Sequence, residues 1–405
     1  MFNYLKEYFD YRTLLPVLGL LVLGIVSVYS ATFDARLPEI FYRQLTFAAI
    51  GMVVLLVLAF FPFKLLHLIS YPAYGLSIIL LVSVLLVGKT VSGSTSWFNL
   101  GAFRLQPSEV AKITTALALA AYLARTDVSL RSIKCFLIAC AIVLFPVALI
   151  MLQPDMGTAL VYLGMFFPVL YWGGATRFTL TTIIAPVIVA VASLFGTTPF
   201  LIAVLVVAIA LYAMRENRVL AALVFSLTVL VGISVQFIYS GLKPYQQKRI
   251  ATFLDPGADP LGAGYNILQS KVAIGSGGLL GKGFLKGTQT QLNFIPEQWT
   301  DFIFCVPGEE FGFVGAAAVL ALFVLVLYRG VAIAASVKNP YSSFLAIALT
   351  ATLATHVFLN IGMSLGLLPV IGVPLPFLSY GGSALFAAMA IIGILMNLYA
   401  HRKEY

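Results

Sequence analysis

Residues 14–33 read LLPVLGLLVLGIVSVYSATF, twenty residues without a charged side chain. About twenty apolar residues in a helix are enough to cross the hydrocarbon core of a bilayer. The run is long for the apolar part of a signal peptide, and no cleavage site of small residues clearly follows it. We therefore interpret it as a membrane-spanning helix that stays in the mature chain.

Similar stretches recur along most of the sequence. Of the 405 residues, 61% are hydrophobic and only 10% are charged, a composition that a soluble domain could not keep on its surface. The pattern predicts an all-α, polytopic integral membrane protein with about 10–12 transmembrane helices and one large extracytoplasmic loop. The expected spans are 14–33, 43–62, 70–88, 108–125, 133–152, 156–174, 178–196, 199–214, 218–240, 302–328, 341–365 and 383–400.

The basic residues of the short loops predict the orientation, because Lys and Arg favour the cytoplasmic side. With these spans, both termini lie in the cytoplasm and the long segment 241–301 lies outside. The net charge of +9 is then mostly an orientation signal, and it does not indicate nucleic-acid binding. The basic residues that fall on one side are Lys6, Arg12, Lys64, Arg125, Arg131, Lys134, Arg177, Arg215, Arg218, Arg329, Lys338, Arg402 and Lys403.

Common cofactor motifs are missing from the sequence. The three cysteines lie within or beside apolar spans and none belongs to a CxxC motif, so we expect buried thiols. The three histidines are scattered, and neighbouring His and Cys residues cannot form a zinc site. The glycine-rich run GSGGLLGKG (275–283) lacks the GK[ST] ending of a phosphate-binding loop, so it predicts no nucleotide site.

Three irregular segments interrupt the helices, and all fall on the predicted outer side: 88–107, 241–301 and 366–383. The last reads GLLPVIGVPLPFLSYGGS. It is apolar but broken by prolines, so its backbone groups would go unpaired against lipid. It must pack against protein or line a cavity, which indicates a functional cavity on that face.

One carboxylate, Asp301, lies near the end of the stretch QLNFIPEQWTDFIF (291–304), where we expect the span 302–328 to begin. A carboxylate at the membrane surface is costly to desolvate and is seldom kept for packing alone. Asp301 is therefore a candidate for chemistry on a charged head group. The structural alternative is that it caps the following helix.

Further charges lie within or near the spans. Glu109 and Lys112, three residues apart in SEVAK, share one face of a helix; they either line a polar cavity or neutralise each other so that the segment can insert. Asp155 begins the next span and is either a first-turn acid or a functional residue. Arg43, at the outer end of the second span, fits an interface anchor as well as a ligand-binding residue.

Two adjacent acids, Glu309 and Glu310, fall about two turns into the expected span 302–328. Here we expect that one pairs with a cation and that the other faces water.

Five motifs, in order along the chain, resemble the SEDS proteins RodA and FtsW. They are QPSEVAK (106–112), QPDMGTA (153–159), DPLGAGYNILQSKVAIGSGGLLGKG (259–283), PEQWTDFIF (296–304) and PFLSYGGS (376–383). The resemblance covers the chain from the first span to the last and implies one transmembrane domain, 1–405. It also implies a peptidoglycan glycosyltransferase that polymerises lipid II outside the bacterial cytoplasmic membrane, working with a class B penicillin-binding protein. The run 275–297 is more similar to the RodA branch, which serves cell elongation, than to the FtsW branch, which serves division.

The sequence departs from the family pattern in two ways. The family usually has ten spans, and the surplus here is a pair near 178–214, whose even number keeps Asp301 outside. Trp299 stands where the family commonly has His, and Asn293 stands where FtsW-like members tend to have an acid.

For the implied reaction, a GlcNAc hydroxyl attacks the anomeric carbon of a MurNAc that carries undecaprenyl pyrophosphate. Asp301 is the candidate general base, or alternatively a ligand for Mg²⁺ or Mn²⁺. The pyrophosphate needs cationic or amide donors, and Arg suits bidentate phosphate contact. The candidate donors are Arg104, Gln106, Arg249 and Lys271.

Two other classes of function stay open. In a lipid II flippase we would expect charges through the spans and a site near the midplane at a repeat interface; here the polar motifs cluster at the outer face and no internal repeat is found. A non-catalytic scaffold for the penicillin-binding protein would have no need of Asp301.

Overall fold

The computed structural model describes residues 9–91, 94–99, 104–214, 218–241, 247, 264–296 and 298–403. The chain forms two compact units, one made of 1–169 with 266–405 and the other of 170–265. Helix α8 (Met156–Trp172) runs across the boundary between them.

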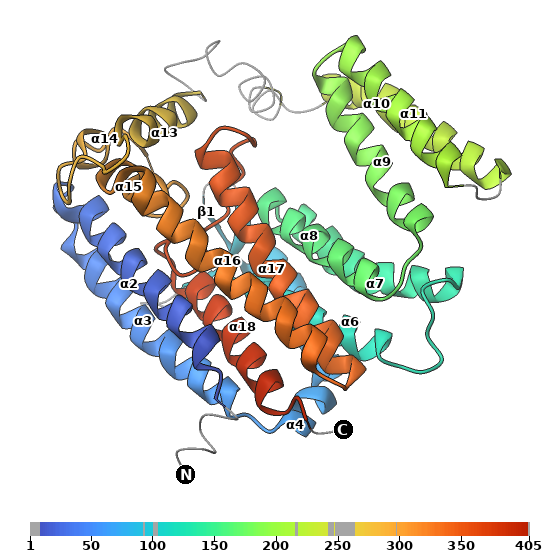
Figure 1. The fold of residues 1–405 in the computed structure, drawn as a ribbon, viewed down its shortest axis with the longest axis horizontal. Coiled ribbons are helices and arrows are strands. Elements are labelled where there is room, and N and C mark those ends of the chain that lie inside the picture. The colour runs from blue at the N-terminus through green and yellow to red at the C-terminus, as the bar shows by residue number, and fades with distance from the viewer. Residues whose placement is uncertain are drawn as a thin grey trace. The chain divides into compact units, whose positions relative to one another are not determined.

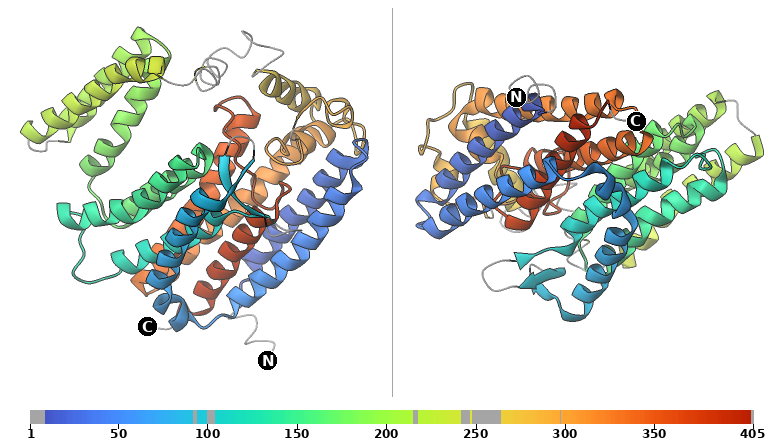
Figure 2. Two further views of the ribbon diagram at one scale, coloured as in Figure 1. Left: turned by 180° about the vertical axis from the view of Figure 1, so that it is seen from behind. Right: turned by 90° about the horizontal axis from the view of Figure 1, so that it is seen from below.

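The first unit is a helical bundle with one small sheet (Figures 1 and 2). Pro38, Pro107 and Pro340 stand in the first turn of α3, α6 and α17, where a missing N–H does no harm. Its helices, besides α8, are α2 (Tyr11–Phe33), α3 (Pro38–Ala59), α4 (Phe63–Leu68), α5 (Ser70–Val87), α6 (Pro107–Leu123), α7 (Ile133–Leu152), α13 (Tyr265–Ser276), α14 (Thr288–Gln291), α15 (Cys305–Glu310), α16 (Gly312–Ser336), α17 (Pro340–Ser364) and α18 (Gly382–Ala400).

The prediction of a polytopic, helical membrane protein is confirmed. Among the described residues, nine helices are long and apolar enough to cross a membrane, and α8 and α10 (Thr197–Ala213) are shorter apolar helices. Helix α2 begins and α18 ends at one end of the bundle, while α13 and α14 lie at the opposite end (Figure 1).

Helices α17 and α18 lie in the interior of the first unit. In each, 78% of the most apolar window is buried, compared with 22% in α3, α5 and α7. Helix α17 packs against α16 and α6, and α18 packs against α3. Polar side chains on α17 therefore face protein and not lipid, which allows a transmembrane helix to carry them.

The segment 88–107 contains a small antiparallel sheet that the sequence reading did not predict. Strands β1 (Lys89–Val91), β2 (Ser94–Asn99) and β3 (Arg104–Leu105) pair in that order. The sheet is attached to the end of α7, where Ser94 Oγ donates to the Gln153 carbonyl at 2.7 Å. Strands of two to six residues are too short for alternation of side chains to reveal them.

The expected span 302–328 starts later than predicted. Residues 301–304 form turns, α15 ends at Glu310, and the long helix α16 begins at Gly312. Gly312 has φ +62°, and a Cβ there would lie 2.3 Å from the Gly281 nitrogen. Only glycine fits this close approach in the left-handed region, and the chain therefore bends between the two helices.

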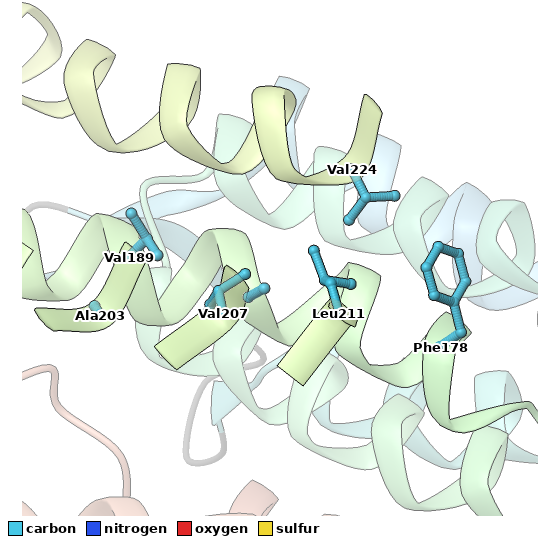
Figure 3. Packing of buried hydrophobic residues seen from close by; sticks show 7 residues of the cluster. Phe178, Val189, Ala203, Val207, Leu211 and Val224 are labelled. Carbon is cyan, nitrogen blue, oxygen red and sulfur yellow. The ribbon is translucent and has the colours of Figure 1, made fainter. Parts of the chain in front are cut away.

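The second unit contains α9 (Arg177–Leu194), α10 and α11 (Arg218–Gly241). Helices α9 and α10 correspond to the surplus pair expected near 178–214. Their core with α11 is apolar and includes Phe178, Val189, Val207, Leu211 and Val224 (Figure 3).

Candidate functional site

The site is arranged around the non-helical residues 366–381, which connect α17 to α18 and which we call the proline segment. Val373, Leu375, Phe377 and Leu378 are at most 1% exposed. A Cβ on Gly24 of α2 would lie 2.3 Å from the Phe377 carbonyl oxygen, so helix and segment are in direct contact. The prediction that this proline-broken stretch packs against protein is confirmed.

The proline segment binds the residues just before Asp301. Ser379 Oγ donates to the Thr300 carbonyl at 2.6 Å, and the Tyr380 amide donates to the Trp299 carbonyl at 2.8 Å. The loop that carries Asp301 is thus held by its main chain, although it belongs to no regular helix.

Asp301 lies against the middle of this segment. Its Oδ2 is 3.4 Å from the position that a Cβ on Gly372 would take, and Gly372 has φ +67°. The Asp301 carbonyl accepts a hydrogen bond from Asn360 Nδ2 of α17 at 2.8 Å. The cap residues of α15 and α16 are Phe304 and Phe311. The alternative that Asp301 caps the following helix is therefore wrong.

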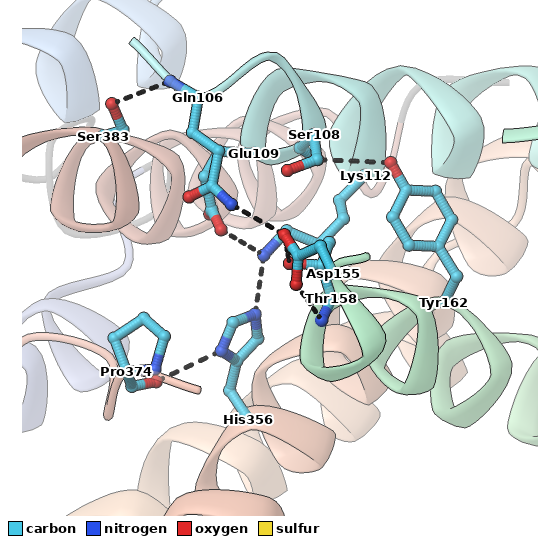
Figure 4. Close-up of polar contacts among 10 residues, drawn as sticks. All are labelled: Gln106, Ser108, Glu109, Lys112, Asp155, Thr158, Tyr162, His356, Pro374 and Ser383. Carbon is cyan, nitrogen blue, oxygen red and sulfur yellow. Dashed lines mark hydrogen bonds and ion pairs between the residues drawn. The ribbon is translucent and has the colours of Figure 1, made fainter. Parts of the chain in front are cut away.

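The Glu109–Lys112 pair faces the interior of the bundle (Figure 4). The two residues are 4% and 3% exposed, and Lys112 Nζ lies 2.7 Å from Glu109 Oε1. Lys112 Nζ is also 2.7 Å from His356 Nε2, and His356 Nδ1 is 3.2 Å from the Pro374 carbonyl. Since an ammonium only donates, Nε2 of His356 accepts and Nδ1–H donates to Pro374. The three side chains line a cavity of about 20 Å³, room for about one water molecule.

Asp155 caps the first turn of α8, which confirms its structural role. Its carboxylate accepts from the Thr158 amide at 3.0 Å and from Thr158 Oγ1 at 2.8 Å. Gln106 Nε2 also donates to Asp155 Oδ2 at 3.0 Å (Figure 4). A Cβ on Gly157 would lie 2.7 Å from the Ile371 carbonyl oxygen, so the start of α8 touches the proline segment next to Gly372.

The remaining predicted binding residues have fewer contacts with the proline segment. Lys271, exposed on α13, reaches the start of the proline segment: a Cβ on Gly366 would lie 2.2 Å from its Cε. Arg104 is exposed, and its carbonyl accepts from Ser383 Oγ at 2.6 Å. Arg43 is exposed and forms an ion pair with Glu39 at 3.6 Å. Arg249 lies outside the described residues.

Sequence reasoning missed three polar residues that contact the site: His356 and Asn360 of α17, and Gln44 of α3. Gln44 Nε2 donates to the Ser379 carbonyl at 3.3 Å, whereas its neighbour Arg43, the predicted residue, is exposed. His356 and Asn360 are four residues apart in an apolar span, a spacing that puts both on one helix face and could have revealed them.

The adjacent acids Glu309 and Glu310 are both 0% exposed but have different partners. Burial favours the neutral form of Glu309, but the Gln289 and Thr290 amides and Lys282 donate to it and together hold its pKa below the ordinary value. Burial raises the pKa of Glu310, which bonds to Ser30 and Gln291. The predicted cation partner is confirmed for Glu309; the prediction that the other acid faces water is wrong.

The glycine run 275–283 is hydrogen-bonded to the backbone at the junction of α15 and α16. The amides of Lys282 and Gly283 donate to the Glu309 and Glu310 carbonyls at 3.0 and 2.9 Å, and the Phe313 amide donates to the Gly278 carbonyl at 2.9 Å. These glycines thus allow backbone to approach backbone, a role that needs no phosphate.

A helical bundle with this buried polar network and a carboxylate packed against a proline-broken segment defines a class of multi-pass membrane protein, and the chain belongs to the FtsW/RodA/SpoVE family. The family model, described as "Cell cycle protein", matches residues 11–199 and 176–404.

Named relatives and solved structures are similar over nearly the whole chain. Peptidoglycan glycosyltransferase MrdB of Escherichia coli (strain K12) is 39% identical over 98% of this chain and 95% of its own length. Peptidoglycan glycosyltransferase RodA of Treponema pallidum is 35% identical over 97% and 98%. A chain in a solved peptidoglycan synthase complex is 30% identical, with a TM-score of 0.76 over 98% of this chain and 99% of that one. The rod shape determining protein RodA of Thermus thermophilus is 26% identical, with a TM-score of 0.66 over 98% of both chains.

Proposed function

We propose that this chain polymerises lipid II at the outer face of the bacterial cytoplasmic membrane, with Asp301 at the reacting centre. The class of enzyme is that of its relatives: the chain is a peptidoglycan glycosyltransferase, and the likeness to MrdB and RodA fits a role in cell elongation. The observation that carries the role of Asp301 is its position. Its main chain is fixed, its carboxylate lies at Gly372, and it is not the cap residue of α15 or α16.

In the proposed reaction, the GlcNAc 4-hydroxyl oxygen forms a bond to the anomeric carbon of MurNAc. The bond from that carbon to the pyrophosphate oxygen breaks, and the pyrophosphate leaves with the electron pair. Asp301 takes the hydroxyl proton as general base, because a neutral hydroxyl is a weak nucleophile.

Eight charged or amide residues form the proposed substrate-binding set. Lys271 supports binding of the pyrophosphate, since this exposed cation lies against the proline segment that also carries Gly372. The remaining members are Arg43, Arg104, Gln106, Glu109, Lys112, Asp155 and Arg249.

A divalent cation is a second part of the proposal. In the described part of the chain, no group of three or more His, Cys, Asp or Glu side chains could hold one. Asp301 would supply one carboxylate, and Mg²⁺ accepts this when substrate phosphates and water fill its other positions. Bound there, the ion would neutralise charge on the pyrophosphate.

The proposed surroundings are a class B penicillin-binding protein and membrane lipids. A structurally similar chain is part of a peptidoglycan synthase complex, which supports a partner of that kind. Both termini would be cytoplasmic and 241–301 extracytoplasmic, consistent with α13 and α14 lying at the end of the bundle opposite to the one where α2 begins and α18 ends (Figure 1).

The test is to reconstitute the purified protein with lipid II, with and without its partner, and to measure glycan polymer. Asp301→Asn keeps the shape but removes the basic oxygen, so polymerisation should fall about 100- to 10,000-fold. Expression and lipid II binding should change little. Normal polymer from well-folded Asp301→Asn would overturn the catalytic assignment. Lipid II crossing the bilayer without polymer would favour a flippase, and polymer made only by the partner would favour a scaffold.

A further inference from the structure

Two side chains on one face of α17 bind consecutive carbonyls of the proline segment. Asn360 Nδ2 donates to the Val373 carbonyl at 2.8 Å, and His356 Nδ1 donates to the Pro374 carbonyl at 3.2 Å. The two residues are 0% and 6% exposed. Helix α17 therefore grips the segment directly beside Gly372, where the Asp301 carboxylate lies.

Each of the two side chains also reaches a second group. The same Nδ2 of Asn360 donates to the carbonyl of Asp301 itself at 2.8 Å. Because both partners are carbonyls, which only accept hydrogen bonds, the atom of Asn360 that contacts them must be the amide nitrogen. The Oδ1 atom of Asn360 has no hydrogen-bond partner. His356 accepts from Lys112, which pairs with Glu109. The two residues thus connect the backbone at Asp301 with the buried ion pair of α6 (Figure 4 shows the His356 half).

We propose that Asn360, assisted by His356, is a positioning residue that fixes Asp301 for proton transfer. This rests on the proposed function, in which Asp301 is the base. Residues 301–304 form turns, so the direction of the Asp301 side chain depends on where its own backbone is held. Misplacing a reacting group by about 1 Å can reduce a rate about 100-fold, and Asn360 joins the two stretches of backbone that meet at the carboxylate.

The chain offers a matched control in Asn397 of α18. This asparagine is 1% exposed and donates to the carbonyls of Leu58, Ala59 and Phe61 at 3.0, 3.2 and 2.6 Å. Asn360→Leu and Asn397→Leu therefore remove the same kind of buried amide, one beside Asp301 and one between α18 and the end of α3.

The experiment compares thermal unfolding and polymerisation kinetics of the two variants in the reconstituted full-length protein. Both should unfold at a lower temperature. Only Asn360→Leu should lower kcat per folded molecule, by about 10- to 100-fold, with KM for lipid II within about twofold. Equal kcat in Asn360→Leu and Asn397→Leu, or a loss confined to KM, would overturn the proposal.

A second variant, His356→Gln, applies if Asn360→Leu does not fold. Glutamine Oε1 can still accept from Lys112 in place of Nε2, so the buried ammonium keeps a partner. Glutamine has no donor atom at the position of Nδ1, so we expect the bond to Pro374 to be lost. We expect kcat per folded molecule to fall about 3- to 10-fold, with a loss of thermal stability no larger than that of Asn397→Leu. Unchanged kcat would show that the bonds from α17 to the proline segment do not position Asp301, and would overturn the proposal.

Asp301→Asn separates this inference from the proposed function. If Asp301→Asn is inactive while Asn360→Leu behaves like Asn397→Leu, only the positioning role is wrong. If Asp301→Asn polymerises normally, the catalytic assignment fails first, and the positioning role fails with it.

Discussion

The interior of the first unit differs from the interior of the three-helix unit α9–α11 in how deeply its helices are buried and in how polar its side chains are. In α17, 78% of the most apolar window is buried, and the helix carries His356, Asn360 and several hydroxyl groups inside the protein. In α9 and α11 the corresponding windows are 28% and 17% buried, and the core is aliphatic and aromatic (Figure 3). A membrane helix can carry hydrogen-bonding side chains only where other helices surround it. The polar chemistry accordingly lies in the first unit.

The largest expected effect tests whether the polar interior is as constrained as its contacts indicate. Glu109→Ala leaves Lys112 without its carboxylate, and breaking a buried pair in this way costs about 3–5 kcal/mol. Chemical or thermal unfolding in detergent measures this. Glu39→Ala is the control, because it removes an exposed pair with Arg43 that is worth about 0–1 kcal/mol.

The double variant Glu109→Ala, Lys112→Ala should recover part of that stability, since no unpaired ammonium remains. A stable, fully active Glu109→Ala protein would mean that the interior of the first unit tolerates charge as readily as the surface does.

The second prediction compares two glycines in the left-handed backbone region, one in each unit. Gly372 and Gly174 have φ +67° and +76°, so valine strains the backbone similarly at both. Nothing lies within 4 Å of a Cβ at Gly174, whereas Asp301 Oδ2 lies 3.4 Å from one at Gly372. A Cβ at that distance is already in van der Waals contact, so the γ-methyl groups of Gly372→Val should displace Asp301 and lower polymerisation about 100-fold. Gly174→Val should leave turnover per folded molecule unchanged. Equal turnover in the two variants would show that the position of Asp301 beside Gly372 does not determine activity.

A third effect should be confined to the apolar unit. A Cβ on Gly232 of α11 would lie 2.5 Å from the Phe200 ring and 2.6 Å from Val189 Cγ1. Gly232→Leu overpacks this contact and should lower the free energy of unfolding by about 1–3 kcal/mol. Because Asp301 lies in the other unit, kcat per folded molecule should stay constant. A fall in kcat at constant stability would show that α9–α11 take part in catalysis.

The smallest effect concerns pH. Glu309 has a pKa below the ordinary value of 4.5, so the stability it contributes is present above pH 4.5 and is lost as the pH falls through its folded pKa. Glu310, with its pKa raised by burial, has the opposite sign: its contribution is full below pH 4.5 and declines as the pH rises through its folded pKa.

Hydrogen exchange of the α14 amides at Gln289 and Thr290, which donate to Glu309, reports this directly. Glu309→Gln should weaken the protection of these two amides above pH 4.5. The unmodified chain should lose protection at these amides as the pH falls through the folded pKa of Glu309, and the Glu309→Gln variant should not show that loss. The described residues of α9–α11 contain no Asp or Glu, so exchange there should follow only the intrinsic pH dependence. Identical profiles for Glu309→Gln and the unmodified chain would contradict the assigned pKa.

Much of the fold could be predicted because each span is a local property. Length and hydropathy placed a helix at every expected span, with the main error at 302–328, where the bend at Gly312 depends on the approach of Gly281. The site was predictable in part. A charge such as Glu109, Lys112 or Asp301 stands out in an apolar sequence, while Asn360 and His356 do so less because amides and imidazoles are neutral.

By itself, the sequence determined the class of protein, the order of its helices and the family, since apolar runs and local motifs need no distant partner. Only the tertiary structure decided that Asp301 packs against the proline segment, that Glu310 is buried, and that α17 joins Lys112 to that segment. These facts depend on contacts between residues far apart in the chain, such as Lys112 with His356 and Asp301 with Asn360. Helix periodicity fixes which side chains share a face, and packing alone decides what that face meets.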